Sequence, residues 1–350
     1  MKKAALTGIK KFDVIESKMP IIKNPGDVLL KINSVGVCGS DIHYYTEGKI
    51  GDQIIDFPFT IGHECSATVV ETGSNVSKVK LGDIVAVDPL VACHKCSQCK
   101  SGREHTCLNQ KFLGCPGQLE GCLAEFIIMP EENCFIVPQS VNQELAMLIE
   151  PLSIGYYAVQ LMLIHSHKDL DKKNSIGILG SGPIGLSVSL CLQASGFKNI
   201  FVTDKLDYRL TVASNAGAFW TSNPDNEDVV ESMLKINPDR LDFVFECCGK
   251  QEAIDQAIEL LKPGGMLLLV GIPEVDFISF NISKIRRKEI TIQNVRRQNK
   301  SVQPVIDLIS SGKISPDFML THRFPLENTG EAFDIVSNYK DGVIKALIQM

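Results

Sequence analysis

The chain has 350 residues, of which 44% are hydrophobic and 22% charged, and its formal net charge is −6. This length predicts about two domains of roughly 150 residues each, large enough to fold around hydrophobic cores without disulfide bonds. The ordinary composition excludes a disordered, collagenous or repetitive chain. The negative net charge gives no general attraction to nucleic acid or to an anionic membrane.

Targeting signals are not evident in the sequence. The first ten residues carry lysines but no uninterrupted apolar run, so they do not resemble a signal peptide. The apolar stretch at residues 176–192 is interrupted by Gly, Ser and Pro and is too short to span a bilayer. We therefore expect a cytoplasmic protein with no membrane or nucleic-acid partner.

The first 150 residues contain short apolar runs separated by turn residues. Runs of this length, with β-branched side chains and bounding Gly, Pro and Asn, are typical of strands in a β-rich domain. The predicted strands are Val28–Ile32, Ala67–Glu71, Ile84–Val87 and Ala124–Ile128.

From about Ser175 onward, apolar runs alternate with segments of helical length. The predicted strands are Ser175–Leu179, Ile200–Thr203, Leu241–Phe245 and Met266–Val270. The predicted helices are Ile184–Ala194, Tyr208–Asn215, Asp228–Ile236 and Ala253–Leu261, with a further helix at Gln303–Ile309. Strict alternation of this kind predicts βαβ units, and therefore an α/β fold with a doubly wound parallel sheet.

A glycine-rich turn joins the first of these strands to the first helix. The sequence from Gly180 to Gly185 has the pattern G-x-G-x-x-G. At this position Gly180 permits the tight turn, Gly182 allows backbone to approach a pyrophosphate, and Gly185 lets the helix pack closely on the strand. The exposed N–H groups at the helix start would then bind the phosphates of a dinucleotide.

An acidic residue, Asp204, ends the second strand about 20 residues beyond this turn, where a ribose-binding carboxylate is expected. A carboxylate accepts hydrogen bonds from ribose hydroxyls and repels a 2′-phosphate, which favours NAD over NADP. Lys205 and Arg209 weaken this preference without reversing it. A glycine-rich turn that binds no nucleotide is the alternative.

The chain contains 12 cysteines, and four of them are clustered: Cys93, Cys96, Cys99 and Cys107. Without a secretory signal, clustered cysteines favour metal over disulfides. Four thiolates can close a tetrahedron around zinc and leave no open position, which predicts a structural ion. The alternatives are a reduced loop without metal and a nucleic-acid-binding zinc ribbon, although a ribbon usually separates two cysteine pairs by a longer stretch.

A second metal site is indicated by residues far apart in the sequence. A catalytic zinc needs about three protein ligands and an open fourth position. Cys38, His63 and either Glu64 or Glu150 would satisfy this requirement. Each also has an ordinary structural interpretation: Cys38 as a core thiol, His63 as a buried imidazole, and Glu150 as an acid at a helix N-terminus.

Taken together, these motifs make the chain resemble the zinc-dependent medium-chain dehydrogenases, and in particular their polyol branch, typified by sorbitol dehydrogenases. The resemblance runs nearly end to end. The segments that carry it are 36–44, 62–64, the four-cysteine lobe, 149–153, the Gly180–Gly185 turn and 321–326.

The resemblance implies two domains and two zinc ions per chain. A β-rich, GroES-like catalytic domain would comprise residues 1–152 and 294–350, and a Rossmann domain that binds NAD would comprise residues 153–293. Catalytic zinc would be held by Cys38, His63 and Glu64, with Glu150 holding the zinc-bound water or entering the coordination shell. The family is commonly tetrameric, so a homotetramer is expected, with a homodimer as the alternative.

The resemblance also implies contacts to substrate and cofactor. Tyr44, Glu150 and Arg297 would contact the polyol. The cofactor contacts would come from the glycine-rich turn, the adenosine side and the nicotinamide side: Gly180, Gly182, Pro183, Ile184, Gly185, Asp204, Arg209, Val270, Gly271, Ile272, Val295, Arg296 and Arg297.

Two features depart from the pattern of the polyol branch. The chain keeps the four-cysteine lobe, which some polyol dehydrogenases lack. Beside Arg297, where the branch usually carries aromatic residues, this chain has Arg296 and Gln298. These two side chains predict a more polar pocket, which makes a substrate with a carboxylate, a phosphate or additional hydroxyls a further possibility.

The expected reaction is the reversible oxidation of a secondary alcohol to a ketone, with NAD as hydride acceptor. Zinc would act as a Lewis acid on the alcohol oxygen. The proton would leave through Ser40 and, as the resemblance implies, a ribose hydroxyl toward His43. The enzymatic alternatives are a related dehydrogenase acting on threonine, a vicinal diol or a sugar phosphate. A zinc-stabilised NAD-binding sensor without turnover is the non-enzymatic alternative.

Overall fold

The structure is a computed structural model of the chain, and it describes residues 1–166 and 170–350. The chain divides into two compact units: residues 1–150 with 302–350, and residues 151–301. The first unit contains both ends of the chain. The second boundary falls later than the expected 293/294, because the segment after strand β17 (Thr291–Asn294) stays attached to its own sheet: Val295 N donates to Leu269 O at 2.9 Å.

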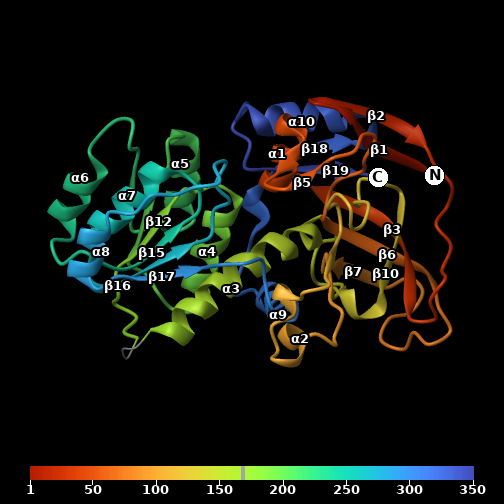
Figure 1. Cartoon of the computed structure of the whole chain (residues 1–350), viewed down its shortest axis with the longest axis horizontal. Helices are drawn as coiled ribbons and strands as arrows, with labels where there is room; N and C mark the ends of the chain where they lie inside the picture. Colours follow the sequence, from red (N-terminus) through yellow and green to blue (C-terminus); the bar gives the residue numbers. More distant parts are fainter. Residues whose placement is uncertain (167–169) are drawn as a thin grey trace. The chain divides into compact units, whose positions relative to one another are not determined.

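The first unit is built on a seven-stranded sheet with the strand order β11-β7-β6-β3-β19-β18, and β10 also pairs with β3 (Figure 1). Its strands are β3 (Asp27–Gly36), β6 (Glu64–Thr72), β7 (Ile84–Val87), β10 (Phe126–Pro130), β11 (Cys134–Ile136), β18 (Leu320–Pro325) and β19 (Lys345–Gln349). The four predicted strands of this region correspond to β3, β6, β7 and β10. Their inward side chains, including Leu30, Ile32 and Val85, form the core of this unit.

Smaller elements complete the first unit. They are β1 (Lys2–Gly8), β2 (Lys11–Glu16), α1 (Gly39–Glu47), β4 (Lys49–Ile50), β5 (Gln53–Ile54), β8 (Leu90–Val91), α2 (Ser97–Lys100), β9 (Lys111–Phe112), α9 (Val302–Ser310) and α10 (Thr329–Ser337). The sequence analysis did not predict β1, β2, α1 or α10. Helix α9 was predicted, within one residue at each end.

The second unit is a six-stranded parallel sheet with the strand order β14-β13-β12-β15-β16-β17. Its strands are β12 (Ile176–Leu179), β13 (Ile200–Thr203), β14 (Trp220–Ser222), β15 (Leu241–Glu246), β16 (Leu261–Leu269) and β17. The connecting helices are α4 (Pro183–Ala194), α5 (Asp207–Asn215), α6 (Val229–Ile236), α7 (Gln251–Leu260) and α8 (Ile282–Lys288). Parallel neighbours require such crossovers.

The order of these strands fixes where a ligand would bind. The chain winds from β12 outward to β14 on one side, then returns to β15 beside β12 and winds outward to β17 on the other. In open α/β sheets, ligands bind at the carboxyl ends of the strands where this order reverses. That point lies between β12 and β15, and the glycine-rich turn follows β12 directly. The predicted doubly wound sheet is confirmed.

Helix α3 (Ile149–His165) belongs to a long apolar segment, Leu145–His165. Within the described residues, one segment, Leu145–His165, could cross a membrane by length and composition, with a mean hydropathy of 1.4. However, 72% of its most apolar window is buried inside the protein. Such burial is typical of a helix in a protein core. The sequence analysis overlooked this segment.

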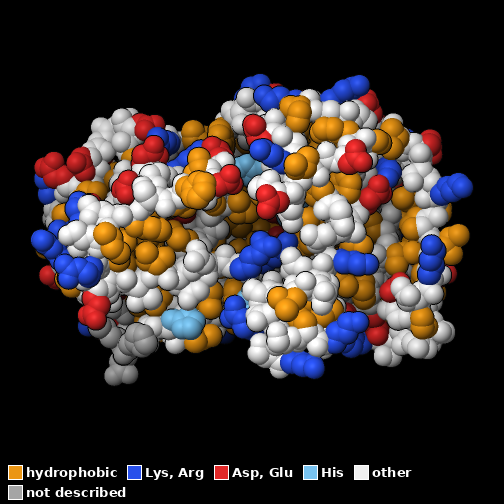
Figure 2. All heavy atoms as spheres, viewed as in Figure 1, with side chains coloured by type: hydrophobic (Ala, Val, Ile, Leu, Met, Phe, Trp, Pro, Cys, Tyr) orange, Lys and Arg blue, Asp and Glu red, His pale blue; other side chains and the backbone are white. Residues whose placement is uncertain are grey.

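Charged side chains of both signs are intermixed on the face drawn in Figure 2. Neither sign of charge dominates the described part of this face.

Candidate active site

Strand pairing in the first unit brings the residues of the second predicted metal site together. In the antiparallel pairs of β3, Gly36 lies opposite Glu64 of β6 and opposite Leu347 of β19. The chain leaves β3 at Gly36 and reaches Cys38 two residues later, while His63 immediately precedes β6. Cys38 and His63, which are remote in sequence, therefore become neighbours at one end of the sheet.

The potential ligand atoms of Cys38, His63 and Glu64 all lie within 4.8 Å of one another. His63 and Glu64 are buried, with exposed fractions of 6% and 1%, and Cys38 is partly exposed. A thiolate, an imidazole and a carboxylate are ligands that zinc accepts in catalytic sites. The described residues therefore offer a donor set that fits zinc.

Cys38 precedes the first turn of helix α1 as its N-cap residue. A cysteine binds metal through its sulfur atom. Ser40 in the first turn donates to Cys38 Sγ at 3.3 Å. His43 lies one helical turn beyond Ser40 and is partly buried, so both members of the predicted proton path lie on α1.

His63 is held in place by two neighbours. Asp41 Oδ1 lies 3.4 Å from His63 Nδ1, and the ring of Phe112 packs against the imidazole with centroids 5.3 Å apart. A carboxylate at Nδ1 orients the ring and leaves Nε2 for a metal. Burial lowers the pKa of His63, but Asp41 and Cys38 raise it well above its usual value. The surroundings of His63 therefore strongly favour a positive charge, which a proton or a metal ion can supply.

The two candidate glutamates have different environments. Both carboxylate oxygens of Glu64 accept from Lys345 Nζ, at 2.8 and 2.6 Å. Glu150, in the first turn of α3, is buried, and its Oε2 has no hydrogen-bond partner among the described residues. Burial raises the pKa of Glu150 to about 7, with Glu64 adding to the increase and His63 opposing it. Glu64 lies closer to Cys38 and His63, whereas Glu150 retains an unpartnered acceptor.

Sequence reasoning missed two residues of this site. Asp41 lies three residues after Cys38, and that spacing could have identified it. Lys345 lies 281 residues from Glu64, and no local pattern marks it. Burial lowers the pKa of Lys345, but Glu64 and Cys38 raise it above its usual value, so the ammonium remains charged.

The four clustered cysteines form a separate lobe. Their sulfur atoms also lie within 4.8 Å of one another, and Cys96 Sγ is 3.5 Å from Cys99 Sγ and 3.9 Å from Cys107 Sγ. Four sulfurs at about 2.3 Å from a tetrahedral zinc would be about 3.8 Å apart, so the arrangement fits the ion. Backbone N–H groups, that of Lys95 foremost, lower the pKa of Cys93 to about 5, which favours the thiolate.

We expect Cys96→Ser to remove the zinc of this lobe and lower thermal stability, because a closed structural site contributes directly to folding. Cys134→Ala, in the same unit but outside both clusters, is the control. Zinc content by atomic emission should fall by one ion per chain in Cys96→Ser only. A Cys96→Ser protein with unchanged zinc content and melting temperature would contradict a structural ion.

In the second unit, the backbone of the glycine-rich turn favours or requires glycine at two positions. Gly180 has a φ of 97°, a left-handed conformation that favours glycine. A Cβ at Gly185 would lie 1.9 Å from Gly180 O, so only glycine fits there. Gly182 is the N-cap of α4, Pro183 occupies its first turn, and Ile184 follows. Gly182 therefore places no side chain at the N-terminus of α4.

Asp204 and Arg209 lie beside this turn. Asp204 Oδ2 accepts from Ser181 N at 2.7 Å, and Oδ1 accepts from Leu206 N at 2.9 Å. A Cβ at Gly182 would lie 3.2 Å from Arg209 Nη1. The two residues predicted for the adenosine half are thus brought together at the glycine-rich turn.

The segments predicted to flank nicotinamide follow β16 and β17. Val270 N and Gly271 N both donate to Glu246 O at 2.9 Å, and Ile272 is half exposed. After Val295, Arg296 is exposed, and Arg297 is partly buried with a φ of 54°. All of them follow the carboxyl ends of strands in the second unit.

Two residues invoked for the substrate pocket are engaged elsewhere. Gln298 is buried, and its Oε1 accepts from Ser301 N at 2.9 Å. Tyr44 is also buried, and its hydroxyl donates to Gln53 Oε1 at 3.0 Å. Through Oε1, Gln298 therefore supports its own loop.

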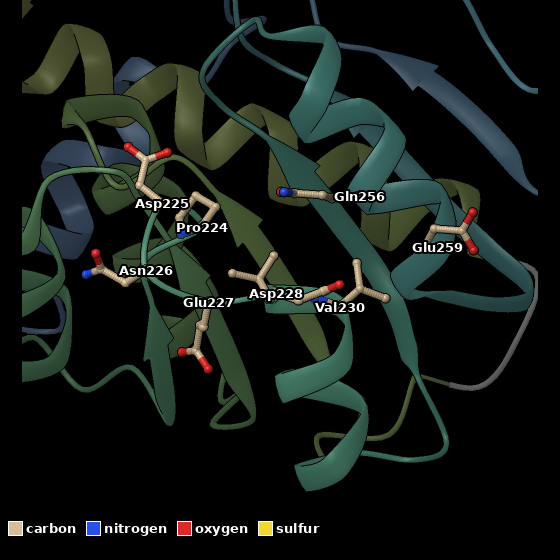
Figure 3. Close-up of a pocket in the computed structure, with 9 residues that line it drawn as sticks. Pro224, Asp225, Asn226, Glu227, Asp228, Val230, Gln256 and Glu259 are labelled. Carbon is tan, nitrogen blue, oxygen red and sulfur yellow. The ribbon is translucent and has the colours of Figure 1, made fainter.

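A cavity of about 690 Å³ in the second unit has a lining that includes none of the predicted site residues. Figure 3 shows its lining, which includes the acidic side chains of Asp225, Glu227, Asp228 and Glu259. Carboxylates repel phosphates, so this cavity does not suit a dinucleotide.

Comparison with known proteins assigns the family. The alcohol dehydrogenase GroES-like domain matches residues 24–139, and the zinc-binding dehydrogenase domain matches residues 183–311. The sorbitol dehydrogenase of Bacillus subtilis is 34% identical and covers 99% of this chain and 97% of its own length. The chain therefore belongs to the zinc-binding, medium-chain alcohol dehydrogenases, and it is an oxidoreductase. Within this family it resembles the sorbitol dehydrogenases.

Solved structures agree with this assignment. An Escherichia coli oxidoreductase/dehydrogenase of unknown specificity superimposes with a TM-score of 0.92 at 31% identity, covering 99% of this chain and 98% of its own. Galactitol-1-phosphate dehydrogenase from Escherichia coli superimposes with a TM-score of 0.89 at 28% identity, over 100% of both chains. The family supports zinc and a nicotinamide cofactor, and a small-molecule alcohol as substrate.

Proposed function

We propose that this protein oxidises a secondary alcohol of a polyol, of the sorbitol, iditol or xylitol type, to a ketose and transfers the hydride to NAD. The observation that carries this proposal is the cluster of Cys38, His63 and Glu64, separate from the four-cysteine lobe, in a zinc-binding dehydrogenase. One closed site is enough to hold a structural ion, whereas a second site with mixed ligands suits a catalytic ion.

Each residue of the cluster has a role in this proposal. Cys38, His63 and a glutamate would hold zinc, which supplies a Lewis acid when bound. Asp41 keeps the imidazole of His63 in one orientation. Ser40, which lies within hydrogen-bond distance of Cys38, would accept the proton of the alcohol, and His43, further along α1, would be its final acceptor.

Asp204 supports NAD rather than NADP as the cofactor. Its carboxylate is already fixed by Ser181 N and Leu206 N, and a fixed negative charge beside the ribose repels a 2′-phosphate. The hydrogen bonds to backbone keep this charge in place.

We expect Asp204→Asn to weaken discrimination against NADP by roughly 10- to 100-fold, since it removes the charge and retains one acceptor oxygen. The ratio of kcat/KM for NAD and NADP measures this. Glu231→Gln, an exposed acid of the same unit that pairs with Lys235, is the control. If Asp204→Asn left the ratio unchanged, Asp204 would not set cofactor choice.

A sugar phosphate is the second candidate substrate. It is supported by exposed Arg296 near the predicted nicotinamide segment and by the similarity to galactitol-1-phosphate dehydrogenase. The neutral polyol is preferred here because Gln298, one of the two side chains that predicted a more polar pocket, is buried and its Oε1 accepts from Ser301 N.

The proposal is tested by measuring NADH formation from a panel of polyols, sugar acids, sugar phosphates, threonine and vicinal diols. We expect the highest kcat/KM with a polyol, and loss of activity when zinc is removed by a chelator and recovery when it is restored. Activity with none of the alcohols in a protein that carries two zinc ions would contradict the proposal. A homotetramer in the cytoplasm remains the expected context.

A further inference from the structure

The buried ion pair between Lys345 and Glu64 places a cation directly beside a proposed metal ligand. The two side chains each have an exposed fraction of 1%. Lys345 Nζ contacts three acceptors: both oxygens of Glu64, at 2.8 and 2.6 Å, and Val37 O, at 3.1 Å. An ammonium has three N–H donors, so each of them has a partner in this arrangement.

Lys345 provides the hydrogen bonds that the structure shows for the Glu64 carboxylate. The glycine at position 36 leaves room for the carboxylate, because a Cβ there would lie only 2.3 Å from Glu64 Oε2. A carboxylate has about four acceptor sites, so Glu64 can still approach a cation while it is bound to Lys345. Its negative charge, however, is then shared between two cations.

We propose that Lys345 competes with the catalytic metal for the Glu64 carboxylate and thereby keeps Glu64 a weakly held, exchangeable ligand. The inference rests on the proposed function, since it requires an ion at Cys38 and His63. Lys345 is a positioning residue in this proposal, because it acts through Glu64.

The competition follows from electrostatics. An ammonium next to a divalent cation repels it, and the low dielectric of a buried site strengthens that repulsion. Glu150 differs from Glu64, whose two oxygens both accept from Lys345, because Glu150 Oε2 has no hydrogen-bond partner among the described residues. Removing the charge of Lys345 would therefore release Glu64 toward the metal while Glu150 stays where it is.

The test is the rate at which zinc is transferred from the loaded protein to a chromophoric chelator. Wild type should release two ions per chain, one from Cys38 and His63 and one from the four-cysteine lobe, which serves as an internal reference. Cys38→Ser identifies the phase of the catalytic ion. We expect Lys345→Met to slow this phase roughly tenfold and to leave the lobe phase unchanged.

Three further variants separate competition from a general change in structure. Lys345→Arg keeps the charge and should release zinc at the wild-type rate. Lys345→Met combined with Glu64→Gln should lose the slow release, because the neutral amide is a poor metal ligand. Lys345→Gln removes the charge but keeps a hydrogen-bond donor, and it replaces Lys345→Met if the lobe phase shows that the latter does not fold.

Release from Lys345→Met, or from Lys345→Gln in its place, at the wild-type rate or faster, with the lobe phase unchanged, would overturn the inference alone. A wild-type protein that binds zinc only in the lobe would overturn the proposed function as well. The two failures are therefore distinguishable before any activity is measured.

Discussion

Replacing Cys38 by serine is expected to lower kcat/KM at least about 1000-fold and to reduce the zinc content from two ions to one per chain. The thiolate is the strongest donor of the mixed cluster, and a serine hydroxyl is not ionised at neutral pH and binds zinc poorly. His63 and Glu64 lie close to Cys38, but two ligands do not hold the ion.

Zinc analysis and steady-state kinetics with NAD and the best polyol measure this effect. Cys134→Ala is the matched control, since Cys134 is buried in the same unit and lies outside both clusters. It should keep two ions and near wild-type turnover. A Cys38→Ser protein with two bound ions and full turnover would show that the mixed cluster is not the catalytic site.

Replacing Lys345 by methionine is expected to lower the free energy of unfolding of the metal-depleted protein by about 3–5 kcal/mol, because breaking a buried ion pair leaves an uncompensated charge. Lys345 and Glu64 are both almost completely buried, so water cannot solvate the remaining carboxylate. Adding Glu64→Gln should restore much of the loss, since it removes that charge.

Urea unfolding of the metal-depleted proteins measures the difference, because bound zinc would itself add to the stability. Lys340→Met is the matched control: Lys340 pairs with Asp334 at 2.9 Å, but these side chains are 57% and 49% exposed. An exposed pair contributes about 1 kcal/mol or less. Equal losses in Lys345→Met and Lys340→Met would contradict a special role for the buried pair.

The sequence determined the local elements well where their periodicity is strong. In the second unit, β13 was predicted at its observed bounds, because parallel strands buried on both faces have continuous apolar sequences. The helices α4 and α5 were predicted within one residue of their observed bounds. The glycine-rich turn was identified from its spacing and from its position between a predicted strand and a predicted helix. The four-cysteine lobe is also local, because its ligands lie within residues 93–107.

Elements with weaker patterns were missed. Helix α1 contains Ser40, His43 and buried Tyr44, and its short, largely polar sequence gives no clear periodicity. Strand β19 was also missed, although it lies inside the main sheet of the first unit between β3 and β18. The position of a strand within a sheet is set by long-range pairing, which a local window does not contain.

The sequence by itself determined the residue types of this protein: a thiol, an imidazole and carboxylates able to hold zinc, and a turn able to bind a dinucleotide. Only the tertiary structure decided which of them meet. The pairing of β3 with β6 and β19 places Cys38, His63 and Glu64 together, and it brings Lys345 from the end of the chain to Glu64. Burial then determines their chemistry, because charges removed from water must find partners within the fold.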